Sequence, residues 1–169
     1  MDLLHVVLRV VHIGAGIIWV GSAAFLHFFI EPTMHALGPQ GGPFMTYMIE
    51  KRKVPVVIAV SSVLTVVAGI ILYWRDTDGF DPDLVTTSVG IGFAVGGIVA
   101  IIAFFLGVGV VRPMVVRMSS MAGAIASGSP SPEQVQEFGA LQRRLRNIST
   151  LNLVLLGIAV IAMAGARYF

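Results

Sequence analysis

The chain has 169 residues, of which 56% are hydrophobic and only 12% are charged, and its mean hydropathy is +0.89. These values lie far from those of soluble proteins and indicate an integral membrane protein. The absence of cysteine excludes disulfide bonds and thiolate metal sites. The net charge of +2 reflects an uneven distribution of basic residues between loops and argues against a nucleic-acid partner.

Four apolar runs are long enough to cross a hydrocarbon layer of about 30 Å. Because backbone polar groups in lipid need partners within the chain, these runs predict four helices packed as one bundle surrounded by membrane lipid. We therefore expect a single all-α transmembrane domain over residues 1–169, with spans at about residues 3–30, 54–74, 86–111 and 147–167.

Basic residues determine the expected orientation, since the cytoplasmic loops of membrane proteins carry an excess of lysine and arginine. The second loop holds Arg75 among several aspartates, whereas the first and third loops are basic. We therefore predict a multi-pass protein of the plasma membrane, with both termini on the outer side and the basic loops in the cytoplasm. The basic loop residues are Lys51, Arg52, Lys53, Arg112, Arg117, Arg143, Arg144 and Arg146.

Two amphipathic segments are expected at the cytoplasmic surface. Residues 44–53 follow a cluster of glycine and proline and predict a short interfacial helix. Residues 132–146 predict a helix that has Ser131 as its N-cap and Pro132 at its first position, and that continues into the fourth span. Its basic residues either mark the topology or contact anionic lipid headgroups. They are Arg143, Arg144 and Arg146.

The third span carries small residues at spacings of three and four, which places them on one face of a helix. Such a face allows close helix packing in a membrane, and it also leaves room for a flat cofactor. Both interpretations remain open from the sequence. The small residues are Gly92, Gly96, Ala100, Ala103 and Gly107.

All four histidines lie within the first 35 residues, and three of them fall inside the first apolar run. Ionisable groups within a span are rare and costly, and they indicate a functional site by default. At about 100° per residue, the polar and aromatic residues of this run share an arc of about 80° around the helix axis. They are His5, Arg9, His12, Trp19 and His27.

The outer part of this helix predicts a haem site. His12 lies about 13 Å below the start of the helix and suits an axial ligand of haem iron, while Arg9, about one turn nearer the surface, suits a haem propionate. Met163 in the fourth span lies at a similar depth and is the intrachain candidate for the second axial ligand. A histidine of a second copy, a water or an open position are alternatives, as is a purely structural role for the histidines and Arg9. His5 and Trp19 complete the expected cofactor-binding set.

The inner end of the first span predicts a different site. His27, Glu31 and His35 recur every four residues, and imidazole and carboxylate groups suit zinc or iron, while nearby methionine sulfur suits copper(I). Pro32 disfavours a helical conformation at Glu31 and is expected to break this alignment. A solvated helix end with core methionines is the alternative.

The run Leu8 to Ile13, followed by Trp19-Val20-Gly21 and by Phe25 to Pro32, resembles the first helix of the CopD/HemJ-like group of small membrane proteins, which includes the DUF2269 relatives. The shared element is a histidine seven residues before a tryptophan. The resemblance implies that His12 is a haem or metal ligand, in a haem-b oxidoreductase or in a protein of copper uptake. The third span lacks the lysine that HemJ-like proteins carry in a later span, so protoporphyrinogen oxidation is not implied. Glu50-Lys51-Arg52 and the fourth span are also similar.

Two functions therefore remain open from the sequence. The first is a haem-b membrane redox protein, either an electron carrier or an oxidoreductase, that works with a second copy of itself or with a membrane redox partner. The second is a non-enzymatic membrane protein that handles copper, or an accessory subunit that packs against a membrane complex through its third span.

Overall fold

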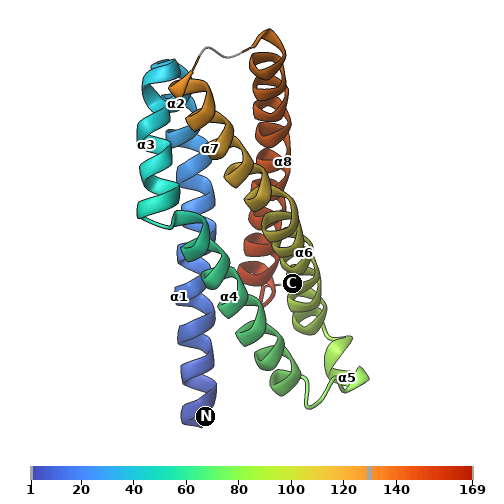
Figure 1. Ribbon diagram of the computed structural model, residues 1–169. Coiled ribbons are helices and arrows are strands. Elements are labelled where there is room, and N and C mark those ends of the chain that lie inside the picture. The colour runs from blue at the N-terminus through green and yellow to red at the C-terminus, as the bar shows by residue number, and fades with distance from the viewer. Residues whose placement is uncertain (1, 129–130, 169) are drawn as a thin grey trace.

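The computed structural model describes residues 2–128 and 131–168 of the chain, and the elements in these ranges are helical. Four continuous helices are long and apolar enough to cross a membrane, which confirms the predicted all-α fold with four long apolar helices. Figure 1 shows that they alternate in direction and pack as a bundle. Their bounds are Leu3–Leu37, Val54–Asp76, Ser88–Ala122 and Pro132–Gly165.

The first long helix contains α1 (Leu3–Phe25), a π-helical turn (Leu26–Ile30) and α2 (Glu31–Leu37). A 3-10 turn (Gly38–Gly41), α3 (Gly42–Thr46) and a second π-helical turn (Tyr47–Lys51) lead into α4 (Val54–Asp76). The short α5 (Pro82–Val85) precedes α6 (Ser88–Leu106), which continues through a third π-helical turn (Gly107–Val111) into α7 (Arg112–Ser127). The last helix is α8 (Pro132–Gly165).

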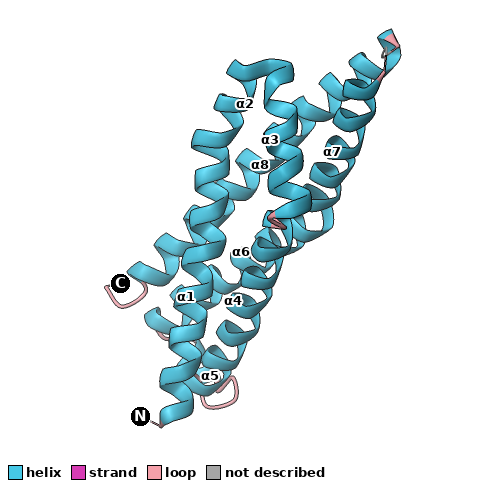
Figure 2. Cartoon of the chain, turned by 60° about the vertical axis from the view of Figure 1, so that its left-hand side comes forward, coloured by secondary structure: helices cyan, strands magenta, loops and turns pink. Residues whose placement is uncertain are grey.

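The start of α1 and the end of α8 lie on the side of α5, and α2, α3 and the start of α8 lie on the opposite side (Figures 1 and 2). We call these the terminal end and the basic end of the bundle, respectively, because the lysine and arginine residues of the first and third loops gather at the second. The helix α1 packs chiefly on α4, and α6 packs chiefly on α8. The bundle therefore consists of two helix pairs that meet along a shared core.

The core is small and lies between the two pairs. Trp19 of α1 is only 3% exposed and packs edge-on against Phe104 of α6, with ring centroids 6.5 Å apart. Ala103 and Leu156 complete the buried cluster. Most large apolar side chains of the four helices instead point outward, as expected for helices that are surrounded by lipid.

The expectation that Pro32 disfavours a helical conformation at Glu31 is wrong. Glu31 has helical φ and ψ angles of −57° and −52°, and its N–H bonds to the carbonyl of Leu26, five residues earlier. This wider turn accommodates the proline ring, which would clash with a carbonyl in a regular α-helix. The same arrangement precedes Pro113, where the N–H of Arg112 bonds to the carbonyl of Gly107. Both helices consequently extend beyond the predicted spans.

The start of α8 agrees with the prediction. Ser131 is the N-cap, its hydroxyl accepts a hydrogen bond from the backbone N–H of Gln134, and the Gln134 side chain accepts one from the Ser131 N–H. This capping box satisfies two backbone donors that the helix itself leaves unpaired. The helix then continues from Pro132 into the fourth apolar segment without a break.

The small residues of the third span serve helix packing. A Cβ atom at Gly92 would lie 2.7 Å from the Cβ and 3.0 Å from the Cα of Ala166, and one at Gly96 would lie 2.6 Å from the Cγ of Met163. The face at these two positions is therefore covered by α8. This excludes the alternative in which a flat cofactor lies against α6 at Gly92 and Gly96.

We predict that Gly92→Ala destabilises the bundle by about 1–3 kcal/mol, because the backbone of Ala166 cannot move away without separating the two helices. Gly97→Ala is the matched control, since a Cβ at Gly97 meets nothing within 4 Å. It should be neutral or slightly stabilising, as alanine is the better helix former. Thermal unfolding in detergent micelles measures both effects, and equal stabilities of the two variants would contradict the packing role of Gly92.

Candidate functional site

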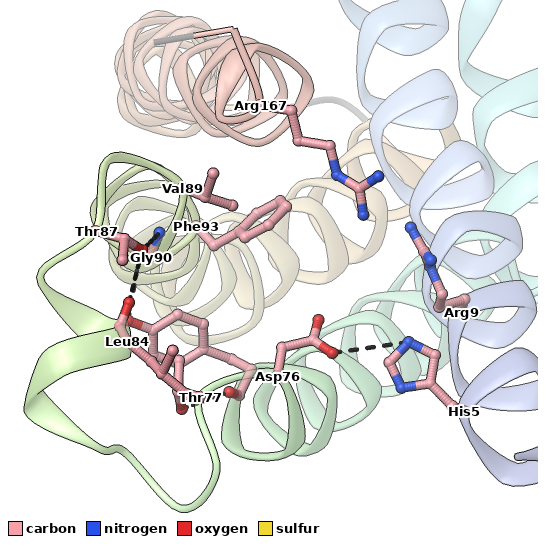
Figure 3. Close-up of a pocket in the computed structure, with 11 residues that line it drawn as sticks. His5, Arg9, Asp76, Thr77, Leu84, Thr87, Val89, Gly90, Phe93 and Arg167 are labelled. Atoms are coloured by element: carbon pink, nitrogen blue, oxygen red, sulfur yellow. Dashed lines mark hydrogen bonds and ion pairs between the residues drawn. The ribbon is translucent and has the colours of Figure 1, made fainter. Parts of the chain in front are cut away.

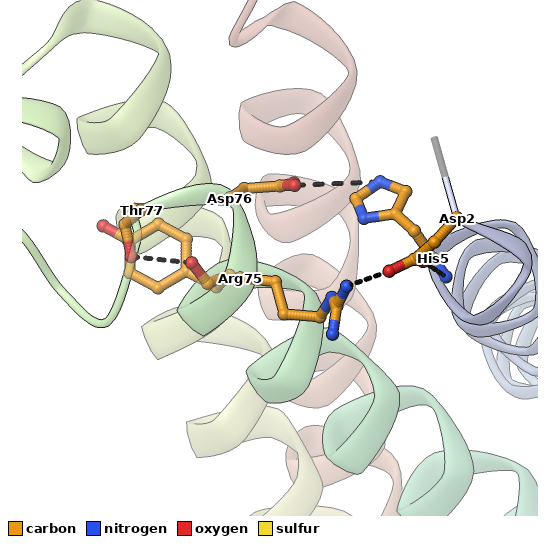
Figure 4. A network of polar contacts seen from close by, with 6 residues as sticks. Asp2, His5, Arg75, Asp76 and Thr77 are labelled. Carbon is orange, nitrogen blue, oxygen red and sulfur yellow. Dashed lines mark hydrogen bonds and ion pairs between the residues drawn. The ribbon is translucent and has the colours of Figure 1, made fainter.

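A polar network joins the start of α1 to the end of α4 (Figure 4). The Asp2 carboxylate is the N-cap of α1 and accepts a hydrogen bond of 2.8 Å from the backbone N–H of His5. It also accepts a hydrogen bond of 2.5 Å from Nη2 of Arg75. Nε2 of His5 lies 3.7 Å from Oδ1 of Asp76. Residues that are far apart in the sequence thus hold the start of α1 against the end of α4 at the terminal end.

These contacts stabilise the ionised form of Asp2. The pKa of its carboxyl lies below the ordinary value of 3.8, first because the carboxylate accepts the His5 backbone N–H and then because the Arg75 guanidinium is close. The carboxylate also lies at the N-terminus of a long helix, where negative charge is favourable. Asp2 is therefore negatively charged at neutral pH.

Next to this network is a cavity of about 240 Å³. Figure 3 shows it between α1, α4, the start of α6 and the segment that follows α8. Aromatic and aliphatic side chains form part of its wall, and polar and charged side chains form the rest. The lining residues are His5, Arg9, Tyr73, Asp76, Thr77, Leu84, Thr87, Val89, Gly90, Phe93 and Arg167.

Two arginines give this cavity a positive charge. Arg9 comes from α1 and Arg167 from just beyond the end of α8, and both extend their guanidinium groups into the same region (Figure 3). Within residues 2–128 and 131–168, neither arginine forms an ion pair. Asp76 is the acidic lining residue, and it contacts His5. The cavity consequently favours an anionic group, with Phe93 offering an apolar contact beside it.

His12 lies one helical turn deeper than Arg9 and is held against α4. Its Nδ1 is 2.8 Å from the backbone carbonyl oxygen of Thr65. Since a carbonyl only accepts, Nδ1 carries the proton, and in the neutral ring the lone pair is on Nε2. A Cβ at Gly69 would lie 2.8 Å from Cε1 of His12, so the ring occupies space that only glycine leaves open. The imidazole is therefore fixed in position and tautomer.

Other predicted site residues lie elsewhere. Met163 packs its side chain against Gly96, which places it on the pair formed by α6 and α8. Trp19 lies in the packed core, about 10 Å deeper along α1 than His12. Neither residue lines the cavity at the terminal end, whereas Arg9 and His5 do, and His12 lies one turn deeper, outside the lining. The expected cofactor-binding set is thus divided between a cavity, a helix contact and the core.

The predicted inner metal site keeps His27 beside Glu31 but not His35, so the regular alignment of the three residues is broken. His27 Nδ1 lies 3.3 Å from Oε2 of Glu31, but His35 lines another cavity with residues of α8. The π-helical turn inserts one residue into the α-helical pattern, which rotates later residues by about 100° around the axis. Across the described part of the chain, no three histidine, aspartate or glutamate side chains are placed to bind one metal ion. A copper function stays a prediction without a ligand cluster to support it.

Four residues that line the cavity were not predicted as site residues from the sequence. They are Arg167, Asp76, Tyr73 and Phe93. Arg167 follows an apolar helix and precedes Tyr168, a pattern that is typical of a membrane interface. The sequence offered one indication of the role of Arg167: outside α1, the arginines of the terminal end are Arg75 and Arg167. The hydrogen bond of Arg75 to Asp2 leaves Arg167 as the second cation of the cavity.

Comparisons with protein-family models, with curated proteins and with solved structures give no match for this chain. The resemblance of the first helix to CopD/HemJ-like proteins therefore stays a prediction.

We predict that the Asp2 contacts make the stability of the protein depend on acidic pH. Because the pKa of Asp2 is lowered in the folded state, its contribution is complete above about 4 and is lost as the pH falls through the folded-state value. Asp2→Asn keeps an N-cap acceptor but removes the charge. The unfolding temperature of the wild type should exceed that of Asp2→Asn at about pH 6, and the difference should shrink towards about pH 3.

Asp78→Asn is the control for the loss of one negative charge at the same end, since Asp78 makes no ion pair among the described residues. A difference between wild type and Asp2→Asn that stays constant over the whole pH range would contradict the role assigned to the Asp2 carboxylate.

Proposed function

We propose that the protein is a haem-b-binding membrane redox protein, either an electron carrier or an oxidoreductase, with its haem near the terminal end of the bundle. The observation that carries this proposal is the convergence of Arg9 and Arg167 on one cavity, one helical turn outward of a histidine whose ring is fixed. A pair of cations beside an apolar wall and a positioned imidazole suits a ligand with two carboxylates and a metal centre.

The two guanidinium groups match the polar edge of haem b, which carries two propionates. Arginine binds carboxylates through paired N–H donors, and such charge-assisted hydrogen bonds are roughly twice as strong as neutral ones. The cavity of about 240 Å³ is smaller than the roughly 300–1,000 Å³ of pockets that enclose a whole ligand. Its size therefore suits the propionate edge of the ligand, with Phe93 contacting the adjoining apolar part.

His12 would be the residue that ligates the haem iron. Its Nδ1–H donates to the Thr65 carbonyl, and a hydrogen bond of this kind typically fixes the tautomer and raises the basicity of a ligating histidine. The ring lies in the space that Gly69 leaves open, and this close contact with α4 restricts its rotation. Because Met163 packs against Gly96 between α6 and α8, whereas the His12 ring lies against α4, a second ligand would come from a histidine of a second copy or from water, or the position would stay open. When bound, haem iron supplies reversible one-electron transfer.

The distribution of basic residues supports an orientation with the terminal end outside. Lysine and arginine of the first and third loops gather at the basic end, which is the signature of the cytoplasmic side. We therefore place the haem site in the outer leaflet of the plasma membrane. A membrane redox partner or a second copy of the chain would exchange electrons with it there.

Haem binding is tested by purifying the protein from haem-replete cells and recording oxidised and reduced visible spectra, with metal analysis alongside. We expect a Soret band in the wild type. His12→Ala should abolish it, and His35→Ala, at the basic end, should leave it intact. A colourless wild-type protein at full haem supply contradicts the proposal, and the reverse result for the two variants would move the site to the basic end.

The role of the cavity is tested by titrating haem into apo protein. We predict that Arg9→Gln and Arg167→Gln each weaken haem binding roughly 10- to 100-fold, because each removes a charge-assisted hydrogen bond of about 1.5–3 kcal/mol. Arg75→Gln is the matched control at the same end, since Arg75 bonds to Asp2 and does not line the cavity. An equal loss in all three variants would show a general charge effect instead.

A further inference from the structure

A second cavity lies at the basic end, between α2 and the first half of α8. Its volume is about 260 Å³. His35 contributes one side of it, and four residues of α8 contribute the other. They are Gly139, Gln142, Arg143 and Arg146. This cavity plays no part in the proposed haem site, which is at the opposite end of the bundle.

The four residues of α8 form one continuous face. Their spacing of three, four and seven residues along the helix brings them to the same side. Residue 139 has no side chain, and a Cβ there would lie 3.8 Å from Nη1 of Arg143, so the guanidinium extends over the glycine. The result is a hollow that has two arginines in its wall and Gly139, which has no side chain, at its base.

The charge of this hollow is positive and is not neutralised by nearby carboxylates. None of its lining residues is acidic. Within the described ranges, the ion pair of the third loop joins Arg117 to Glu137, and neither Arg143 nor Arg146 takes part in one. The amide of Gln142 and the imidazole of His35 add further hydrogen-bond donors. Such a set of donors is suited to the oxygens of a phosphate group.

The depth of the hollow points to a lipid phosphate. Arg146 precedes Leu151, where the apolar part of α8 starts, by five residues, or about 7–8 Å. His35 follows the apolar end of the first span by the same separation. Both walls therefore continue directly into apolar helices. A lipid whose phosphate binds in the hollow would therefore have apolar helix surface close by, against which its acyl chains can lie.

We propose that this cavity binds the phosphate of an anionic membrane phospholipid, with Arg143 and Arg146 as the charged donors and the acyl chains beside the spans of α1 and α8. Basic hollows between helices at the cytoplasmic side of a membrane bind anionic headgroups through the same chemistry. The occupant is a defined lipid of the leaflet at the basic end. General attraction of a basic helix to the membrane surface would not need the hollow.

The test uses the full-length protein in neutral detergent, titrated with phosphatidylglycerol or phosphatidylcholine, with native mass spectrometry to count bound lipids. We expect the wild type to bind phosphatidylglycerol at least about 10-fold more tightly than phosphatidylcholine. Arg143→Gln combined with Arg146→Gln should remove this preference. Arg144→Gln is the matched control, because Arg144 lies between the two on the same helix and does not line the hollow.

Gly139→Leu fills the hollow without changing any charge and should weaken phosphatidylglycerol binding by a similar factor. Leucine is a strong helix former, so α8 itself tolerates the change. An unfolding temperature equal to that of the wild type shows that a loss of binding is not a folding defect. Equal losses in Arg144→Gln and in the double variant, or full binding in Gly139→Leu, would overturn the proposal in favour of general surface charge. Displacement of the lipid by inorganic phosphate at equal concentration would instead identify a site for soluble phosphate.

Discussion

The contact of the His12 ring with α4 is the constraint on which the terminal end of the bundle depends. The ring reaches the Thr65 carbonyl only because residue 69 has no side chain. In lipid, where no hydrophobic force drives helices together, such a close polar contact contributes directly to helix association. Once this register is set, Arg9 and His5, which lie about one and two turns towards the terminal end, turn towards the cavity.

The two helix pairs use small residues differently. Between α1 and α4, glycine makes room for a polar aromatic ring, whereas between α6 and α8 glycines at 92 and 96 let the backbone and Met163 of α8 approach closely. The first contact places a titratable group at a defined position inside the membrane-spanning region. The second is a packing contact. The imidazole and guanidinium groups within the membrane-spanning region are therefore concentrated on α1. The pair of α6 and α8 contributes mainly helix packing, and Arg167, just beyond α8, contributes one cation to the cavity.

The long apolar runs made the four helices predictable, because no other secondary structure satisfies the backbone of a single segment in lipid. The N-cap at Ser131 was predictable for a similarly local reason. The continuation of the helix through Pro32 was not predictable from the sequence. It depends on a π-helical turn, which forms only where the helix continues on both sides. The approach of Arg167 to Arg9 was not predictable either, because it depends on how the first and last helices pack. The sequence located the histidine and arginine of α1, and only the fold supplied their partners.

The two cavities, one at each end of the bundle, share part of their lining. Each cavity has two arginines and a histidine, and in each the arginines lack a carboxylate partner among the described residues. The surroundings differ, because the cavity at the terminal end also has Asp76 and Phe93 in its wall. The apolar midsection of the bundle separates these two cavities, each of which has two arginines in its lining.

The wide turns before Pro32 and Pro113 determine how the protein is distributed across the bilayer. A continuous helix of 35 residues is about 52 Å long, whereas the hydrocarbon layer is about 30 Å thick. The first helix therefore extends beyond the hydrocarbon layer, and α2, which follows its π-helical turn, lies at the basic end of the bundle (Figure 1). A helix that ended at Pro32 would stop short of His35, so the wider turn is what brings the His35 side chain to the same hollow as Arg143 and Arg146.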